Sequence, residues 1–368
     1  MTSRERLLAV LSGQLPDRVP ISCYELNPFM PDSWEGSQPS FAPLLNAIGE
    51  HTDCLYMLGL PQRDAYLEQH TQVEQWREGG SLFTRTRLQT PRGELGALTR
   101  QDEGVNTVWC LEHLLETRED MEKYLSIPFD PLPCDPAPIA VARERVGDHG
   151  IVMMDGGDAA GTVAGRFPFA AFTEFAFTER GLFTKLVEQQ QELLLWHYRD
   201  QLSKGAGPLY RLCGAEYFTP PYLPPSLFEA YVYRYLAPII DLMHGYGVKV
   251  RVHSHGRVGK VLPMIVDMGA DALDPIEPPP DGDIELAELK RLYGGRLCLF
   301  GNIELRDLEY ASPERMRSIV RETLRAGMPG GGFVLMPSAS PIQAPLASAT
   351  LTNYRIMIET ALEEGQYA

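Results

Sequence analysis

From about residue 140 onward, short apolar runs alternate with longer amphipathic stretches. This alternation predicts parallel strand–helix–strand units, because two neighbouring parallel strands need a crossover connection, which is usually a helix. The chain is therefore expected to be an α/β protein built on a parallel sheet. Strands are expected at 150–154, 208–212, 248–252, 272–276, 297–300 and 332–336, with helices at 182–202, 226–245, 258–268, 284–293 and 313–326.

Polar side chains follow these strands where each one ends. In a (β/α)8 barrel the carboxyl ends of the strands form one face, and residues on that face are usually catalytic. A doubly wound sheet gathers such residues mainly at one switch point. Six consecutive strands with polar ends favour the (β/α)8 TIM barrel. These polar residues are Asp155, Asp158, Glu216, His253, His255, Glu277, Asn302, Glu304, Ser338 and Ser340.

The first 140 residues lack the regular repeat. We expect a single domain over 1–368, in which 1–140 contain N-terminal elaborations and the first strands and 141–368 contain the regular units. The expected elements before 140 are a helix from Ser3, a short strand at Ile21, an apolar run over 53–60, a hairpin over 79–99, a helix over 117–125 and a proline-rich extended segment over 128–138.

Composition excludes several classes of protein. With 368 residues, 44% of them hydrophobic, the chain can bury a large core. A formal charge of −16 argues against a nucleic-acid or anionic-membrane partner. No apolar run approaches the roughly 20 residues that span a bilayer, and no signal peptide is evident, so we expect a cytoplasmic protein. The six cysteines form no CxxC pair, which argues against a zinc ribbon; Cys213, near a strand end, is expected to be structural.

Two histidines follow the expected strand at 248–252. Residues i and i+2 of a strand point to the same face, so His253 and His255 can converge on one atom, and Gly256 lets the chain turn away. A metal ion is the first candidate for that atom. Two unrelated polar histidines at a strand end are an equally open interpretation.

Glu277 ends the next expected strand, 22 positions after His255. Adjacent strands lie about 5 Å apart, so its carboxylate can reach a metal held by the two imidazoles. Two histidines and a carboxylate form a catalytic zinc set, and the same ligands suit iron or manganese. A salt bridge from Glu277 to Arg257 or Lys249 is the alternative.

The remaining candidates lie on other strand ends. Glu216, Asp155 and Tyr217 are the expected catalytic residues, and Tyr222 lies on the same proline-rich loop as Glu216. The alternative for that loop is packing on the next helix. The expected substrate-binding residues are Tyr222, Asn302, Glu304, Ser338 and Ser340.

Several motifs resemble the uroporphyrinogen decarboxylase superfamily over nearly the whole chain. Its members are distorted (β/α)8 barrels and include uroporphyrinogen decarboxylase, zinc-dependent methylcobalamin:coenzyme M methyltransferases and, more distantly, cobalamin-independent methionine synthase. The motifs are Ser3-Arg-Glu-Arg-Leu-Leu-Ala-Val-Leu-Ser-Gly, Pro16-Asp-Arg-Val-Pro, Thr90-Pro-Arg-Gly, His253-Ser-His-Gly, Tyr293-Gly-Gly, Phe300-Gly-Asn and Gly330-Gly-Gly-Phe-Val-Leu.

The methyltransferase branch of this superfamily implies zinc as cofactor. In its pattern His253 matches the first ligand, His255 stands where a cysteine would be, and Glu277 matches the acid, while residues 337–340 lack the final cysteine. The resemblance also implies a corrinoid as methyl partner, on a separate carrier protein that docks at the barrel mouth. The substrate would be a small molecule different from that of the relatives, and a homodimer is left open.

A decarboxylase working without a metal is the second hypothesis. That branch needs an arginine-rich N-terminal loop, whereas residues 23–29 are acidic and apolar, and its histidine after the last strand is replaced by Ser338 to Ser340. Asp53 would stand for the aspartate that binds the pyrrole nitrogens. A barrel that only binds a small molecule is the third hypothesis. We therefore expect a metal-dependent methyltransferase first.

Overall fold

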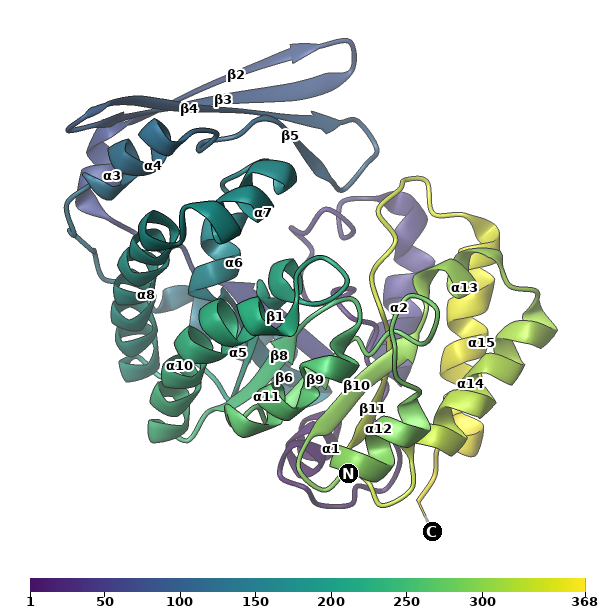
Figure 1. The fold of residues 1–368 in the computed structure, drawn as a ribbon. Coiled ribbons are helices and arrows are strands. Elements are labelled where there is room, and N and C mark those ends of the chain that lie inside the picture. Colours follow the sequence, from purple (N-terminus) through teal and green to yellow (C-terminus); the bar gives the residue numbers. More distant parts are fainter. Residues whose placement is uncertain (368) are drawn as a thin grey trace.

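The computed structural model describes residues 1–367 and contains one curled sheet of seven parallel strands (Figure 1). Their order, β1-β6-β7-β8-β9-β10-β11, follows the chain and is that of a (β/α)8 barrel. The strands are β1 (Cys54–Gly59), β6 (Gly150–Gly157), β7 (Leu209–Cys213), β8 (Lys249–His253), β9 (Ala272–Asp274), β10 (Cys298–Ile303) and β11 (Phe333–Pro337).

A short segment around Ile21 closes the barrel between β11 and β1. Ile21 forms a parallel bridge with Leu335 of β11. On its other side, the Asp53 N–H donates to the Ile21 carbonyl at 2.7 Å, immediately before β1. This segment therefore occupies the eighth strand position, and the barrel predicted from the polar strand ends is confirmed.

All six strands expected after residue 140 are present, within a few residues of their expected ends. Two strands, β6 and β10, run three residues beyond their expected ends, whereas β9 ends early, at Asp274 rather than 276. Pro275 has no N–H to continue the ladder, and Ile276 has a φ of 59°, so the backbone leaves the strand there.

Helices surround the sheet. The expected helix at 226–245 is one continuous run in which α9 (Pro225–Leu227), a π-helical turn (Phe228–Tyr233) and α10 (Arg234–Gly245) follow one another. The other expected ones are α8 (Arg180–Ser203), α11 (Leu262–Asp267), α12 (Leu286–Tyr293) and α14 (Pro313–Gly327). Helices that the sequence did not predict are α2 (Ala42–His51), α3 (Ala65–His70), α5 (Ala137–Val146), α6 (Ala159–Ala164), α7 (Phe169–Thr178), α13 (Leu305–Tyr310) and α15 (Ser348–Glu364).

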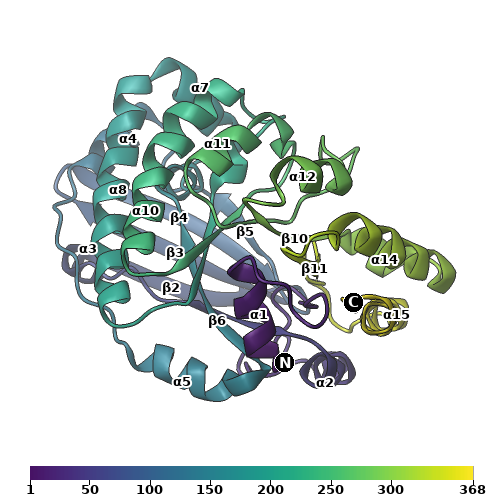
Figure 2. The same ribbon diagram turned by 90° about the horizontal axis from the view of Figure 1, so that it is seen from below.

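The first helix, α1 (Ser3–Leu11), begins at a capping box formed by Thr2 and Glu5. Its side chains Leu7 and Val10 are buried in one cluster with Leu55, Ile151 and Leu209, which come from the start or middle of barrel strands. Figure 2 views the molecule from the side on which α1 lies against the sheet. The helix therefore covers the amino end of the barrel and leaves the carboxyl end for function.

A separate antiparallel sheet is built between β1 and β6. The expected hairpin is present as β3 and β4, within a sheet of order β2-β3-β4-β5 that forms a layer of its own in Figure 1. Asn106, in the loop before β5, donates its N–H to Ile342 in the loop after β11, which ties this sheet to the carboxyl side of the barrel. The elements here are α3 (Ala65–His70), β2 (Thr71–Glu78), β3 (Ser81–Thr90), β4 (Gly93–Asp102), β5 (Val108–Glu112) and α4 (Arg118–Leu125).

The proline-rich segment expected over 128–138 is extended only up to residue 135, because α5 begins at Ala137. It pairs with the start of α3 through a bridge between Asp64 and Pro131, and α5 begins where the segment ends. Within residues 1–367, no helix has both the length and the apolar character needed to cross a membrane.

Candidate functional site

His253 ends β8 and lies beside Asp274, the last residue of β9, because the two strands pair in that register. The His253 side chain is buried, with 3% of the residue exposed, and its Nδ1 lies 2.8 Å from Oδ2 of Asp274. Burial lowers the pKa of His253, even though the Asp274 charge opposes that effect. His253 is therefore a neutral imidazole with its ring orientation set by a carboxylate.

Asp274 was not among the residues predicted for the site. Its other oxygen, Oδ1, lies 3.0 Å from Nε of Arg251, within ion-pair distance. The Arg251 guanidinium is fully buried over the ring of Phe300, at 5.0 Å from the ring centre. Burial alone would raise the pKa of Asp274, but Arg251 and His253 hold it well below its usual range. Arg251, Asp274 and His253 thus form one buried chain that ends at an imidazole.

A second ion pair, between the half-buried Asp155 and the buried Arg211, lies next to this chain. Nη1 of Arg211, on β7, donates to Oδ1 of Asp155 at 2.7 Å, and Nη2 donates to the Tyr24 hydroxyl at 2.9 Å. The Tyr24 ring lies 6.1 Å from the ring of His253. Asp155 is therefore at the predicted face of the barrel, where it neutralises Arg211; its catalytic role stays a prediction.

His255 and Glu277 are brought together, as the sequence predicted. Oε1 of Glu277 lies 2.8 Å from Nδ1 of His255, and Oε2 accepts from the Gly256 N–H at 2.7 Å. Burial works against the charge of His255, but the hydrogen bond and charge of Glu277 raise its pKa. The rings of His253 and His255 lie 4.7 Å apart and nearly perpendicular. The alternative of a salt bridge from Glu277 to Arg257 or Lys249 is not what the structure shows.

The fit of these residues to a metal is partial. Both histidines present Nδ1 to a carboxylate, the arrangement that orients metal-binding imidazoles and leaves Nε2 as the other ring nitrogen. A catalytic zinc centre also uses a third protein ligand. In the part of the chain that is described, no three His, Cys, Asp or Glu side chains are grouped to hold a metal. The two imidazoles suit a divalent ion, while Glu277 is engaged with His255.

The loop after β7 is bonded directly to the loop that carries the histidines. The hydroxyls of Thr219 and Ser254 lie 2.8 Å apart, and the Arg257 N–H donates to the Pro220 carbonyl at 2.7 Å. This loop contributes three of the predicted residues to one hollow of about 470 Å³. The hollow is lined by Phe169, Glu216, Tyr217 and Tyr222.

Phe169 was missed from the sequence, because α7, which it begins, was not predicted. The available signal was the run Phe169-Ala-Ala-Phe172-Thr-Glu-Phe175, whose aromatic residues recur every three positions. The structure places Phe169 on the rim, 47% exposed, with its ring 5.0 Å from that of Tyr222.

A second hollow, of about 440 Å³, is lined in part by Asn302 and Glu304 at the end of β10. Glu304 is only 9% exposed, and its Oε1 has no hydrogen-bond partner within residues 1–367. Burial and the charge of Glu277 raise the pKa of Glu304 to about 7. The Ser338 hydroxyl lies 3.5 Å from Oε2 of Glu304. Both Ser338 and Ser340 are buried. Substrate binding by these four residues stays a prediction.

Three other residues have structural positions. Asp158 caps α6 through its bond to the Gly161 N–H, and burial raises the pKa of the Cys213 thiol to about 12, as expected for a structural cysteine. The interpretation of Asp53 as a substrate-binding aspartate is wrong. Asp53 precedes β1 at the amino end of the barrel, where it is fully buried between Arg6 and Arg18.

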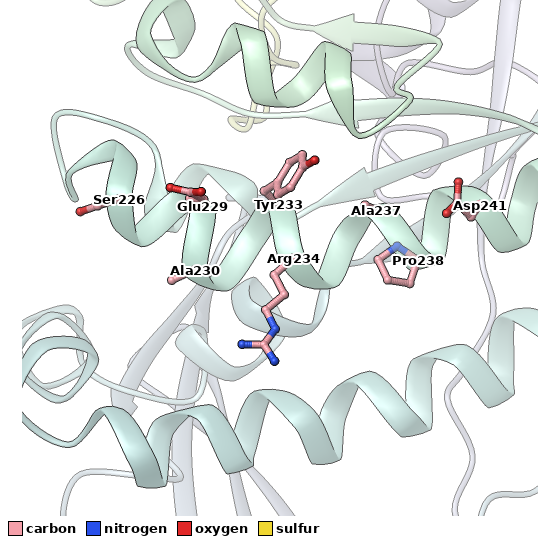
Figure 3. Close-up of a pocket in the computed structure, with 8 residues that line it drawn as sticks. All are labelled: Ser226, Glu229, Ala230, Tyr233, Arg234, Ala237, Pro238 and Asp241. Atoms are coloured by element: carbon pink, nitrogen blue, oxygen red, sulfur yellow. The ribbon is translucent and has the colours of Figure 1, made fainter.

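A further groove, of about 580 Å³, runs along the outer helix formed by α9, the π-helical turn and α10 (Figure 3). In Figure 3 Tyr233 and Arg234 point to opposite sides of that helix. The groove contains none of the predicted site residues. The residues that line it are Ser226, Glu229, Ala230, Tyr233, Arg234, Ala237, Pro238 and Asp241.

Comparisons with known proteins give a family and a fold. The family model described as uroporphyrinogen decarboxylase (URO-D) matches residues 159–361. A methyltransferase from Methanosarcina mazei superposes with a TM-score of 0.62 over 99% of both chains, at 16% sequence identity. A D-psicose 3-epimerase from Clostridium cellulolyticum H10 reaches a TM-score of only 0.39, at 10% identity, over 62% of this chain and 82% of its own. No curated protein matches the sequence.

Proposed function

Because the chain belongs to the uroporphyrinogen decarboxylase family, we propose that it is a methyltransferase of that family, acting on a small substrate at the mouth of its barrel. The similar structure from Methanosarcina mazei bears the name methyltransferase, which supports this choice. The observation that carries the proposal is the pair of imidazoles at the end of β8, each oriented through Nδ1 by its own carboxylate.

The two imidazoles have different protonation behaviour. Burial lowers the pKa of His253, which keeps it neutral and able to accept a proton or offer a lone pair. The pKa of His255 is raised by Glu277 against the effect of burial, so His255 holds a proton to higher pH. In the absence of a bound metal ion, one ring can therefore accept a proton and the other donate one on the same side of the barrel.

The finer proposal is a divalent metal, zinc before iron or manganese, held by His253 and His255. Glu277 would serve as the third ligand, after its hydrogen bond to Nδ1 of His255 is broken. When bound, such an ion would act as a Lewis acid on the oxygen, nitrogen or sulfur that gains or loses the methyl group. By the family resemblance, the methyl partner would be a corrinoid on a separate protein that docks at the barrel mouth.

Decarboxylation of a substrate with many carboxylates receives less support. Two arginines of the barrel strands, Arg211 and Arg251, are buried and paired with Asp155 and Asp274. At the amino end, Arg6 is paired with both Asp17 and Asp53. These arginines are therefore already paired and are not free to bind the carboxylates of an anionic substrate.

Metal analysis of protein purified without a His tag tests the finer proposal. We expect near-stoichiometric zinc in the wild type and its loss from the His253→Ala/His255→Ala double variant. His51→Ala, an exposed histidine on α2, is the matched control and should keep the metal. Wild-type protein that binds no divalent metal after dialysis against zinc, iron and manganese would refute the metal site.

Methyl transfer is then assayed with free corrinoid and a panel of methylated small molecules. Turnover that is lost in the double variant and kept in His51→Ala supports the methyltransferase. Release of carbon dioxide from carboxylated substrates, with no methyl transfer from any donor, would replace the proposal with the decarboxylase.

A further inference from the structure

The hollow between α7 and the loop after β7 combines aromatic walls with one carboxylate. Its lining consists of three aromatic rings, from Phe169, Tyr217 and Tyr222, and the side chain of Glu216, with no lysine or arginine among the described residues that line it. Rings around a carboxylate create a region of negative potential, because the face of an aromatic ring is itself negative. The hollow therefore favours a cation with an apolar surface.

The walls of this hollow are held in place by neighbouring rings. Phe172 lies behind them, 5.9 Å from Tyr217 at 89° and 5.7 Å from Phe169 at 69°. Phe172 is itself fully buried. Meanwhile Tyr222 and Phe169 leave 58% and 47% of their surface exposed, although both are large aromatic residues. Aromatic rings that are fixed from behind and uncovered in front are ready to cover a ligand without reorganisation.

Glu216 has one oxygen committed and one available to a ligand. Oε2 accepts the Gly214 N–H at 2.9 Å, which fixes the carboxylate at the hollow. Three residues further along the same loop, the Thr219 hydroxyl lies 2.8 Å from that of Ser254, the residue between the two histidines. A cation bound at Glu216 would therefore sit near the paired imidazoles.

We propose that this hollow is a cage for a methylated ammonium group, so that the substrate is a methylated amine or quaternary ammonium compound. The inference rests on the proposed methyl transfer, whose substrate class it names. A quaternary ammonium ion cannot donate hydrogen bonds, so aromatic faces and a carboxylate are the groups that recognise it. A neutral aromatic ligand could stack on these rings but would make no favourable charge interaction with Glu216.

The position of the cage suits the reaction. The hydrogen bonds from Thr219 to Ser254 and from the Arg257 N–H to Pro220 fix the cage loop against the histidine loop. The loop that carries the charged group of the hollow is thus bonded directly to the loop that carries His255.

Binding of choline, measured by titration calorimetry on the full chain, tests the cage without requiring catalysis. The neutral isostere 3,3-dimethylbutan-1-ol has the same shape without the charge. We expect choline to bind at least about tenfold more tightly than this alcohol, and Tyr222→Ala and Glu216→Gln each to weaken choline about tenfold. Tyr310→Ala, an 82% exposed tyrosine on α13, is the matched control and should bind choline as the wild type does.

Tetramethylammonium, trimethylamine and glycine betaine extend the titration to other methylated ammonium compounds. Absence of binding by every member of this panel, or equal affinity for choline and its neutral isostere, would overturn the cage. So would unchanged choline binding in both cage variants, with circular dichroism showing that they are folded. Tyr222 is a rim residue, so its variant keeps the test valid if Glu216→Gln fails to fold.

The cage and the methyl transfer fail in different ways. If ammonium compounds bind selectively but no methyl group is transferred, the cage stands and the proposed function is wrong. If methyl transfer occurs from neutral methoxy or thioether compounds while the ammonium panel does not bind, the function stands and the cage is wrong.

Discussion

The two ends of the barrel each contain a fully buried aspartate paired with arginine, but the two networks end differently. At the amino end, both oxygens of Asp53 accept hydrogen bonds, from Arg6, from Arg18 and from the Ile21 N–H. At the carboxyl end, Asp274 lies between Arg251 and His253, and its Oδ1 is near Arg251 without an aligned hydrogen bond. In the first network both carboxylate oxygens of the aspartate are hydrogen-bonded to arginine or backbone groups. The second network ends at the His253 imidazole, which can exchange a proton.

This contrast shows that a buried aspartate–arginine pair can serve either stability or function. The Asp53 network joins α1 to the segment that closes the barrel, so we assign it to stability. The Asp274 network sets the orientation and protonation of His253 at the open mouth, so we assign it to function. Substitution of Asp53 should therefore change stability alone, whereas substitution of Asp274 should also change activity.

The largest effect is expected at the amino end. Asp53→Ala would leave two buried guanidinium groups without their shared carboxylate, and unpaired buried charges are costly. We expect the free energy of unfolding to fall by about 3 to 5 kcal/mol, measured by urea denaturation, with activity per folded molecule unchanged. Asp32→Ala, which breaks the exposed pair with Arg145, is the control and should change stability by less than about 0.5 kcal/mol. A small effect at Asp53 would show that the amino-end network is not structural.

The next effect is expected at the carboxyl end. Asp274→Asn keeps the volume of the side chain but removes the charge that orients His253 and supports its basicity. Loss of such an orienting carboxylate is expected to lower methyl-transfer activity, or metal affinity, about 10- to 100-fold. The readout is the pH profile of kcat and the kcat and KM values, because a purely structural defect would reduce active enzyme without moving the profile. An unchanged profile in folded protein would contradict the role of Asp274.

The smallest effect concerns Glu304, the buried carboxylate at the mouth with an oxygen that has no partner in the described chain. Burial, together with the charge of Glu277, raises its pKa from 4.5 to about 7. A raised carboxyl pKa means that the folded state binds the proton more tightly than the unfolded state. Ionisation therefore costs stability progressively as the pH rises from about 4.5 to about 7.

Glu304→Gln should accordingly be more stable than the wild type at pH 8, by about 1 to 2 kcal/mol, and equal to it at pH 4. Urea midpoints at the two pH values measure the difference. Glu363→Gln, an exposed glutamate on α15, should show no such pH dependence. A difference that stays the same at both pH values would rule out titration of Glu304 as its cause. The buried carboxylate at the carboxyl end would then be as stable in its charged form as the one at the amino end.

Much of the barrel could be predicted from local sequence patterns. The alternation after residue 140 predicted β6 to β11 because strand and helix periodicities are local, and Pro91-Arg-Gly predicted the β3–β4 turn. Helices α7 and α15 were missed, and their stability comes mainly from the elements they pack against.

The candidate site could be predicted in part. His253 and His255 share a strand end, and Glu277 ends the neighbouring strand, so their proximity followed from the barrel order. Their hydrogen bonds did not follow. Asp274 takes Nδ1 of His253 and Glu277 takes that of His255, a choice that depends on register and on the turn made at Ile276.

By itself, the sequence determined the class of fold, the family and the strand ends that carry the polar groups, since these depend on periodicity and motif. Only the tertiary structure decided that Arg251 and Arg211 are neutralised in the interior, that Ile21 closes the barrel, and that Phe169 joins Tyr222 beside Glu216. These contacts connect residues far apart in the chain. Their geometry is set by packing and strand register, on which local sequence carries little information.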